Sequence, residues 1–312
     1  MGVYDSERNF GFGKQIGWAG REALREAFGH GHYATVAAHS ARWNRFTSWL
    51  RGRGIDDACS ITLSALQTYA DDVKRDVESG DMKVSYGQNL LSSVNVVLEA
   101  LRGDRQIRVE PAQIVGRRSA IRTDPPTSYD SARVTEAAQA LRDAGYARAA
   151  AVLELARSWG LRSREASLLD LRKAFREANR RKQITIIKGT KGGRLRKVKV
   201  THPDQIAVLS RGVALQAGGS NIIPPEQSWL QWRNGELRAA RDILHSLGIA
   251  GYHDARAAYA CARYAAITGH PAPVQGGAIM DRERDRSARE DIASELGHGR
   301  INVVAEYIGG RR

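Results

Sequence analysis

Apolar residues recur every three or four positions along most of this chain, which is the spacing of amphipathic helices. The runs 34–52, 62–77 and 86–101 all show this spacing, and a glycine follows shortly after each run as a stop signal. The three runs follow one another with short connections. We therefore expect residues 34–103 to form a helical bundle.

The segments on either side of this bundle have a different composition. Residues 1–33 are rich in glycine and aromatic residues and read as an irregular lead-in that ends in a short helix, AGREALREAFG. Residues 104–127 are polar and basic and contain three prolines, which predicts an interdomain linker. Its arginines would suit contact with a phosphate backbone, although a solvated linker explains them equally well.

A second domain is expected over residues 128–312, and it holds the chain's one clear β signal. Two short runs of high β propensity, QITIIK at 183–188 and LRKVKV at 195–200, are joined by the glycine-rich GTKGG and predict a hairpin. The fold class is therefore mainly α with a small β-sheet. The remaining runs have helical spacing, at 130–144, 146–159, 203–216, 226–247, 253–268, 287–296 and 301–309.

Length and charge narrow the class of protein. The 312 residues are enough for two domains with their own cores, and the formal net charge of +14 favours a polyanionic partner, nucleic acid before a membrane surface. No apolar run is long enough to span a membrane. Cys59 and Cys261 are too few and too far apart to imply a disulfide framework, so we expect a cytoplasmic protein.

The positive charge is concentrated in residues 172–199, where twelve Lys and Arg residues stand against one acid, Glu177. A charge run is usually a solvated face, but so large an excess repels itself unless a polyanion neutralises it. DNA binding is the favoured interpretation. With the linker, the candidate DNA-binding residues are Arg117, Arg118, Arg180, Arg181, Lys182, Arg194 and Arg196.

Several short motifs carry residues that could do chemistry, although each alone has an ordinary structural explanation. GLRSREA at 160–166 places Arg162 after a glycine turn with Glu165 three residues later, and Lys191 lies at the tip of the predicted hairpin. His253 and Arg256 share one face of a helix, where both could donate to one phosphate. The adjacent His253–Asp254 could instead belong to a metal phosphohydrolase, which would need further ligands near it.

A last motif lies close to the end of the chain. His298 stands between two glycines in LGHG, and Tyr307 follows nine residues later in the apolar segment INVVAEYI. In a continuous helix these two side chains would lie on opposite faces. The glycines are expected to break the helix, so that both side chains can reach one point.

The order of these motifs resembles that of the tyrosine recombinase (phage integrase) family. The chain supplies GLRxxE, a hairpin lysine, HxxR, LGH and a following tyrosine, all within 128–312, and residues 34–103 are similar in type and position to the family's core-binding domain. The resemblance implies that Arg162 and Arg256 clamp the scissile phosphate, Lys191 protonates the leaving 5′ oxygen, His253 and His298 assist, Tyr307 is the nucleophile, and Glu165 and Asp254 support the set.

The residue types suit phosphodiester transesterification. Guanidinium forks match the non-bridging oxygens on which negative charge builds up, and nearby cations help a tyrosine lose its proton as it attacks. The family's reaction, through a 3′-phosphotyrosyl link, needs no metal or cofactor, and the resemblance implies a homo-tetramer acting on two paired sites in double-stranded DNA. Integration or excision of a mobile element, or resolution, is the expected outcome.

Two other functions remain open at this point: a type IB topoisomerase-like enzyme that relaxes DNA, and a non-catalytic DNA-binding regulator with the same fold. The chain also departs from the family pattern. The step from His253 to His298 is 45 residues, which points to an insertion at 270–288 that forms a surface loop or a protein contact. Only five residues follow Tyr307 in this sequence, so how protomers link is not evident.

Overall fold

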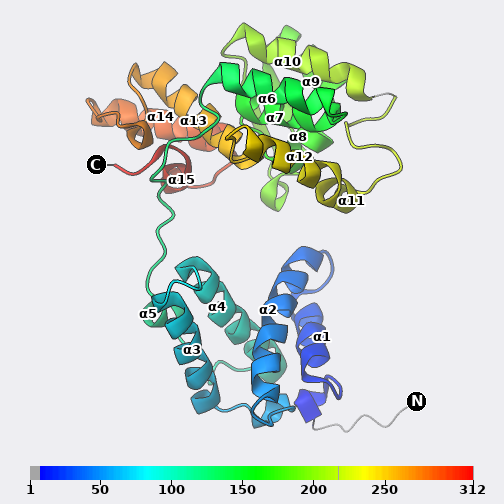
Figure 1. Ribbon diagram of the computed structural model, residues 1–312, viewed down its shortest axis with the longest axis vertical. Coiled ribbons are helices and arrows are strands. Elements are labelled where there is room, and N and C mark those ends of the chain that lie inside the picture. Colours follow the sequence, from blue (N-terminus) through cyan, green and yellow to red (C-terminus); the bar gives the residue numbers. More distant parts are fainter. Residues whose placement is uncertain (1–7, 217, 312) are drawn as a thin grey trace. The chain divides into compact units, whose positions relative to one another are not determined.

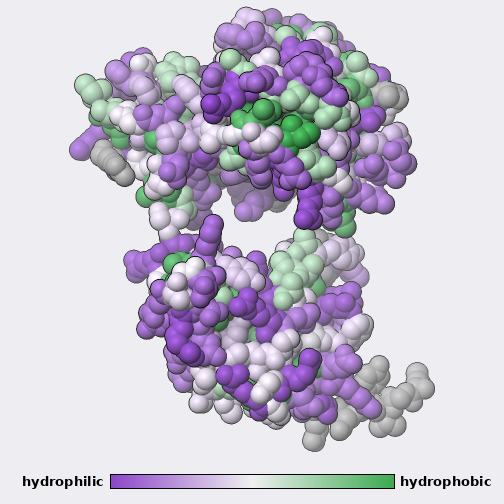
Figure 2. Space-filling model, in the orientation of Figure 1, coloured by the Kyte–Doolittle hydropathy of each residue, from purple (hydrophilic) through white to green (hydrophobic). Residues whose placement is uncertain are grey.

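The computed structural model describes residues 8–216 and 218–311 and divides into two compact units, Met1–Ser119 and Ala120–Arg312 (Figure 1). Hydrophilic side chains cover most of the visible surface of each unit (Figure 2). Among the described residues, no helix is both long enough and apolar enough to cross a membrane.

The first unit is a helical bundle with its own apolar core. Its main helices start and end close to the predicted runs. The predicted stop at Gly103, for example, ends α4 in the left-handed conformation. The elements are η1 (Arg8–Gly11), α1 (Ile16–Phe28), α2 (Tyr33–Arg51), η2 (Ala58–Ser60), α3 (Leu63–Glu78), α4 (Val84–Arg102) and α5 (Pro111–Ile114).

The bundle extends beyond the predicted 34–103 at both ends. Helix α1, expected as the end of an irregular lead-in, packs into the core: the indole of Trp43 donates to the carbonyl of Ile16 at 2.9 Å, and a Cβ at Gly20 would meet the same indole at 2.3 Å. At the other end, Asn95 exchanges two hydrogen bonds with the backbone of Val109. The first part of the predicted linker therefore packs on α4, while residues 1–7 of the predicted lead-in lie outside the described residues.

The second unit is mainly helical with one small antiparallel sheet. This confirms the predicted fold class. Its elements are α6 (Ser131–Asp143), α7 (Ala147–Trp159), α8 (Ser163–Leu168), α9 (Leu171–Arg181), β1 (Gln183–Ile186), η3 (Lys191–Gly193), β2 (Arg196–Lys199), α10 (Pro203–Val213), η4 (Ala214–Gln216), α11 (Trp229–Asn234), α12 (Glu236–Ser246), α13 (Tyr252–Thr268), η5 (Pro273–Gln275), α14 (Arg282–Glu295), η6 (Ile301–Val304) and α15 (Ala305–Ile308).

Helices α7 and α13 form the centre of this unit. Both are rich in alanine and are buried on most of their faces, so their backbones can approach closely, and α13 also packs against α14 and α15. The first turns of α13 carry three of the predicted site residues, His253, Asp254 and Arg256. A buried central helix thus positions these side chains.

The hairpin and the predicted insertion differ in detail from the sequence expectations. Strands β1 and β2 pair in register from Gln183↔Lys199 to Ile186↔Arg196, which leaves Lys191 in the connecting turn. Part of the predicted 270–288 insertion is helical: α14 begins at Arg282, and Asp281 caps it by accepting from two backbone N–H groups of its first turn. The predicted helix 226–247 is two helices, which meet at Gly235.

Candidate active site

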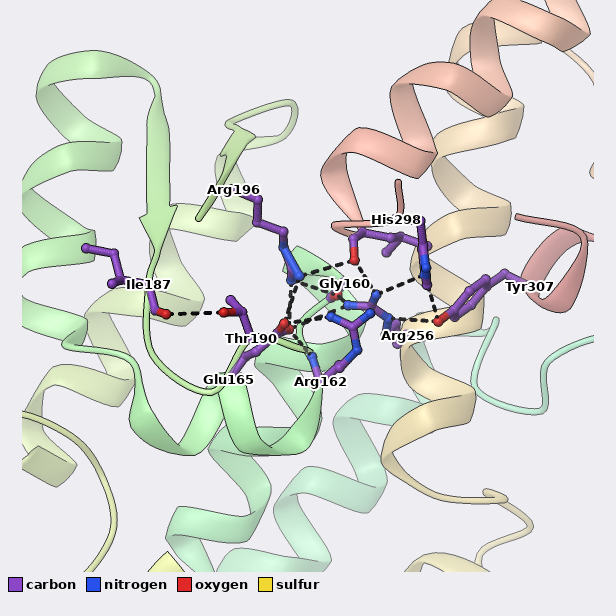
Figure 3. A network of polar contacts seen from close by, with 10 residues as sticks. Gly160, Arg162, Glu165, Ile187, Thr190, Arg196, Arg256, His298 and Tyr307 are labelled. Atoms are coloured by element: carbon purple, nitrogen blue, oxygen red, sulfur yellow. Dashed lines mark hydrogen bonds and ion pairs between the residues drawn. The ribbon is translucent and has the colours of Figure 1, made fainter. Parts of the chain in front are cut away.

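Tyr307 lies inside the second unit with its hydroxyl among polar groups (Figure 3). Its side chain is only 2% exposed, and its hydroxyl oxygen is 3.2 Å from Nε2 of His298. The rings of His253 and His298 both lie 5.4 Å from the Tyr307 ring, centroid to centroid. Because η6 and α15 form a separate short segment after Gly299, the histidine and the tyrosine do reach one point.

Arg256 is fully buried beside this tyrosine. Its Nε donates to the Tyr307 hydroxyl at 3.4 Å, and its Nη2 donates to the carbonyl of Leu296 at 2.6 Å. Its Nη1 donates to the carbonyl of Gly160, which ends α7 in the left-handed conformation. The guanidinium is thus held between three separate segments of the chain, with the tyrosine hydroxyl at one edge.

Glu165 connects the arginines of the site (Figure 3). Its carboxylate has no exposed surface, accepts from Arg162 at 2.7 Å and lies 3.6 Å from Nη1 of Arg256. Its side chain also accepts from the backbone N–H of Arg162, which forms a capping box at the start of α8. One buried carboxylate thus pairs with the guanidinium groups of Arg162, Arg196 and Arg256 and orients them, which is the geometry that a supporting residue would need.

Arg196 requires a correction. The sequence placed it among residues that contact DNA, but its side chain is 6% exposed and donates to both oxygens of Glu165, at 2.9 and 2.8 Å. It points inward because it lies on the same face of β2 as the buried Val198. A guanidinium engaged in this way cannot reach a phosphate backbone, so Arg196 belongs to the support of the site and ties the hairpin to it.

His298 lies in the turn that Gly297 makes with a φ of +69°, where a Cβ would meet the side chain of Arg196 at 2.9 Å. Burial, followed by the positive charges of Arg256 and Arg162, lowers the pKa of His298 to about 4. The imidazole is therefore neutral near pH 7. A neutral ring with an unprotonated Nε2 can accept the proton of the tyrosine hydroxyl.

His253 and Asp254 are neighbours in the sequence but face different surroundings. His253 reaches the surface beside the Tyr307 ring, and desolvation followed by the charge of Arg256 lowers its pKa. Asp254 is buried, and its Oδ2 accepts from the hydroxyl and the backbone N–H of Ser128 and from the hydroxyl of Thr127.

Asp254 therefore anchors the segment before α6 to α13. Its Oδ1 also accepts from Arg122, so the carboxylate is fully engaged and Arg122 is not a free phosphate-binding arginine of the linker. Burial alone would raise the pKa of Asp254, but the hydrogen bonds from Ser128 and Thr127 outweigh it and hold the pKa low. This disfavours the metal phosphohydrolase alternative, and the described part of the chain contains no group of three His, Cys, Asp or Glu side chains that could hold a metal ion.

Lys191 and the other basic candidates lie on the surface. Lys191 is exposed in the turn between β1 and β2, and its charge adds to the effects that lower the pKa of His298. The remaining candidates for DNA contact are exposed, at Arg180, Arg181, Lys182 and Arg194 in the second unit and Arg117 and Arg118 in the first.

The structure thus brings together Arg162, Glu165, Arg256, His298 and Tyr307, with the His253 ring at their edge. Sequence reasoning missed the part that Arg196 plays in this cluster, and also the anchoring by Arg122, Thr127 and Ser128. The alternation of β2 was a usable signal for Arg196. The anchoring residues had none, because they are more than one hundred residues away from Asp254 in the sequence.

The chain was compared with protein-family models, curated proteins and solved structures. A protein-family model described as "Integrase" matches residues 120–262, which lie in the second unit. No curated protein matches this chain.

Among solved structures, one that is similar is the post-cleavage complex of XerH site-specific recombinase bound to palindromic difH substrate. Its TM-score is 0.55 and its sequence identity is 13%, and the match covers 89% of this chain and 77% of that one. The pre-cleavage complex of XerH with difH substrate is similar with a TM-score of 0.53 and 13% sequence identity, and the match covers 88% of this chain and 77% of that one. XerA recombinase matches with a TM-score of 0.40 and 15% sequence identity, and the match covers 92% of each chain. At these identities the two XerH structures show a shared fold.

Proposed function

Since a family model described as "Integrase" matches residues 120–262, we propose that the chain is a member of the tyrosine recombinase (phage integrase) family, a site-specific recombinase that cuts and rejoins double-stranded DNA through Tyr307. One observation carries the proposal. The hydroxyl of Tyr307 lies 3.2 Å from Nε2 of His298 and 3.4 Å from Nε of Arg256, within a single unit. A potential nucleophile, a neutral base and a cation therefore meet at one atom.

The arginines supply the binding site for the scissile phosphate. A phosphodiester carries one negative charge, which increases on its non-bridging oxygens as the phosphorus becomes five-coordinate in the transition state. The side chain of Arg162 is 22% exposed, and its Nη1 donates to Glu165. Its remaining N–H groups can therefore donate to a phosphate. His253 reaches the surface beside the Tyr307 ring and can donate to the same group.

Arg256 must change its contacts to take part. In the structure its donors go to Tyr307, to the carbonyl of Gly160 and to the carbonyl of Leu296. The two carbonyls belong to the fixed backbone. The tyrosine hydroxyl is the partner that gives way, because it moves to the phosphorus as the phosphate takes its place beside the guanidinium.

The proton transfers follow from the same geometry. The phenol oxygen of Tyr307 forms a bond to phosphorus while its proton passes to Nε2 of His298, and the bond from phosphorus to the 5′ oxygen breaks. Lys191, exposed on the hairpin turn, donates the proton that this leaving oxygen needs. The product is a 3′-phosphotyrosyl link, and attack by a 5′ hydroxyl on that link restores the phosphodiester and the free tyrosine.

The partners follow from the charge and from the relatives. The XerH structures hold a difH substrate, and the exposed cations on α9 and the hairpin of this chain fit a phosphate backbone. We propose that a homo-tetramer acts on two paired sites in double-stranded DNA, for integration or excision of a mobile element or for resolution. Inverted repeats in the DNA that flanks the gene are the first candidates for these sites.

Covalent capture on a nicked suicide substrate tests the proposal. The wild-type protein is expected to form a protein–DNA adduct on the correct inverted repeat, because loss of a short nicked fragment prevents rejoining. Tyr307→Phe is expected to form none while its DNA affinity stays within about threefold, since the hydroxyl contributes to chemistry rather than to binding.

The control is Tyr259→Phe, which removes another buried hydroxyl, one that bonds to Glu295 outside the cluster around Tyr307. An adduct formed by Tyr307→Phe would show that another group attacks. Relaxation of supercoiled DNA without regard to the repeat would identify a topoisomerase-like enzyme. Repeat-specific binding with no adduct from the wild type would identify a regulator.

A further inference from the structure

The segment that carries Tyr307 is too short to fix its own position. Helix α15 has four residues, about one turn, and a single turn has little stability alone. Before the tyrosine, the backbone N–H of Arg122 donates to the carbonyl of Ala305 at 2.9 Å. What holds the segment after the tyrosine is a buried ionic cluster that the proposed chemistry does not use.

The chain turns sharply after α15 and runs back over the unit. Gly309 has a φ of +87°, and a Cβ at this position would meet the backbone nitrogen of Val274 at 2.8 Å. The close approach and the positive φ both require glycine. This turn directs the carbonyl groups of Gly309 and Gly310 toward α14.

On α14 these carbonyls meet Arg289, which is 4% exposed. Its Nη1 donates to the carbonyl of Gly309 at 3.1 Å, its Nη2 donates to the carbonyl of Gly310 at 3.4 Å, and its Nε donates to Asp285 at 2.9 Å. The guanidinium fork therefore holds two successive peptide groups that begin two residues after the tyrosine.

Asp285 completes the cluster and joins it to α13. It is 2% exposed and accepts from the hydroxyl of Tyr264 at 2.9 Å and from Nε of Arg311 at 3.0 Å. Burial and the neighbouring Asp285 raise the pKa of Tyr264 to about 12, so this hydroxyl stays protonated and donates. One carboxylate thus links α14, the central helix and the last described residue of the tail.

We propose that Asp285 and Arg289 are positioning residues, a latch that holds the tail after Tyr307 and so sets the tyrosine hydroxyl beside His298 and Arg256. A buried ion pair contributes little net stability compared with apolar side chains of similar volume, so its presence here fits a role in position. The proposal rests on the proposed function of Tyr307 as the nucleophile.

The experiment compares Arg289→Met with a matched control, Arg286→Met, on the same helix. Arg286 is exposed and pairs with the exposed Glu290 at 3.0 Å, so its loss should leave the adduct rate within about twofold of wild type. Arg289→Met should slow single-turnover adduct formation about 30-fold with unchanged DNA affinity, because displacement of a nucleophile by an ångström can cost a hundredfold. Arg289→Lys, which can still donate to one carbonyl, should recover part of the rate.

A spectroscopic measurement on the DNA-free protein gives an independent answer. With 3-fluorotyrosine labelling, the Tyr307 resonance is assigned by its loss in Tyr307→Phe. It should shift or broaden in Arg289→Met and stay unchanged in Arg286→Met. If Arg289→Met does not fold, Arg311→Ala takes its place, because that side chain is 56% exposed and its removal loosens the same latch.

A folded Arg289→Met protein with the wild-type fluorine spectrum and the wild-type adduct rate would overturn the latch. So would an adduct rate that falls only in proportion to the folded fraction, with no recovery in Arg289→Lys. If the wild type forms no adduct on any tested repeat, the proposed function fails, while the fluorine comparison still decides whether Arg289 positions Tyr307.

Discussion

The two sides of the candidate active site are built differently. On the side of α13, α14 and α15, Arg256 and Tyr307 are buried and their polar atoms meet partners within the unit. On the side of the hairpin, Lys191 is exposed in a glycine-rich turn. Contacts within the unit hold the buried side in place, whereas the lysine lies on a short turn at the surface.

This difference separates two physical problems in the proposed reaction. The nucleophile and the two arginines that would hold the phosphate, Arg162 and Arg256, need fixed positions. A buried network centred on Glu165 provides them, although burying its charged groups removes them from water, which is unfavourable. The proposed general acid must reach an oxygen that only the bound DNA supplies, so a turn at the surface suits it. Arg196 joins the two sides, because it lies on β2 and bonds to Glu165.

The largest expected effect comes from breaking the buried side at its centre. Glu165→Gln keeps the size of the side chain but removes the charge that faces Arg162 and Arg196. Loss of one partner from a buried ion pair typically costs about 3–5 kcal/mol in the free energy of unfolding, and the clamp would lose its orientation. We expect a marked loss of stability in urea unfolding and no detectable adduct.

Glu290→Gln is the matched control for this change. Glu290 is exposed and pairs with Arg286 on the surface of α14, where an ion pair contributes about 0–1 kcal/mol. Equal losses of stability in the two variants would contradict the central role of Glu165.

A smaller effect, confined to the rate, is expected from the exposed side. Lys191→Ala should slow cleavage by about 10²- to 10⁴-fold, the usual contribution of a general acid, with unchanged stability because the side chain is exposed. A substrate with sulfur in place of the leaving 5′ oxygen should restore the rate, since a thiolate leaves without protonation. Lys188→Ala, on the same hairpin and also exposed, is the control.

The thio substrate decides the role of the lysine. If it fails to rescue Lys191→Ala while the wild type cleaves it, the lysine contributes to binding or to transition-state charge rather than to proton donation. A DNA affinity reduced as much as the rate would point to the same conclusion.

The comparison also explains how much could be predicted from the sequence. The helical spacing and the single hairpin predicted the fold class, and the order of the motifs singled out the residues that the structure gathers around Tyr307. Arg196 was misassigned because the basic run was counted without the two-residue period of the strand, which places it beside Val198 on the inner face. Asp285 and Arg289 were not singled out from the sequence, because an acid and a base at i and i+4 are common on exposed helix faces and their burial depends on contacts with the segment after Tyr307.

The smallest expected effect concerns the protonation of His298. Its pKa in the folded protein is about 4, below the ordinary histidine value of 6.5, chiefly because of burial and Arg256. Between these two values the unfolded chain binds a proton that the native chain does not, so His298 lowers the stability as the pH falls through that window and has no effect above it. Titration of ¹³C-labelled histidine in the DNA-free protein, with His298→Asn to assign the resonance, should give a midpoint near 4. A midpoint near 6.5 would mean that neither burial nor the neighbouring arginines act on this ring, and His298 would then be a weaker candidate for the base that receives the Tyr307 proton.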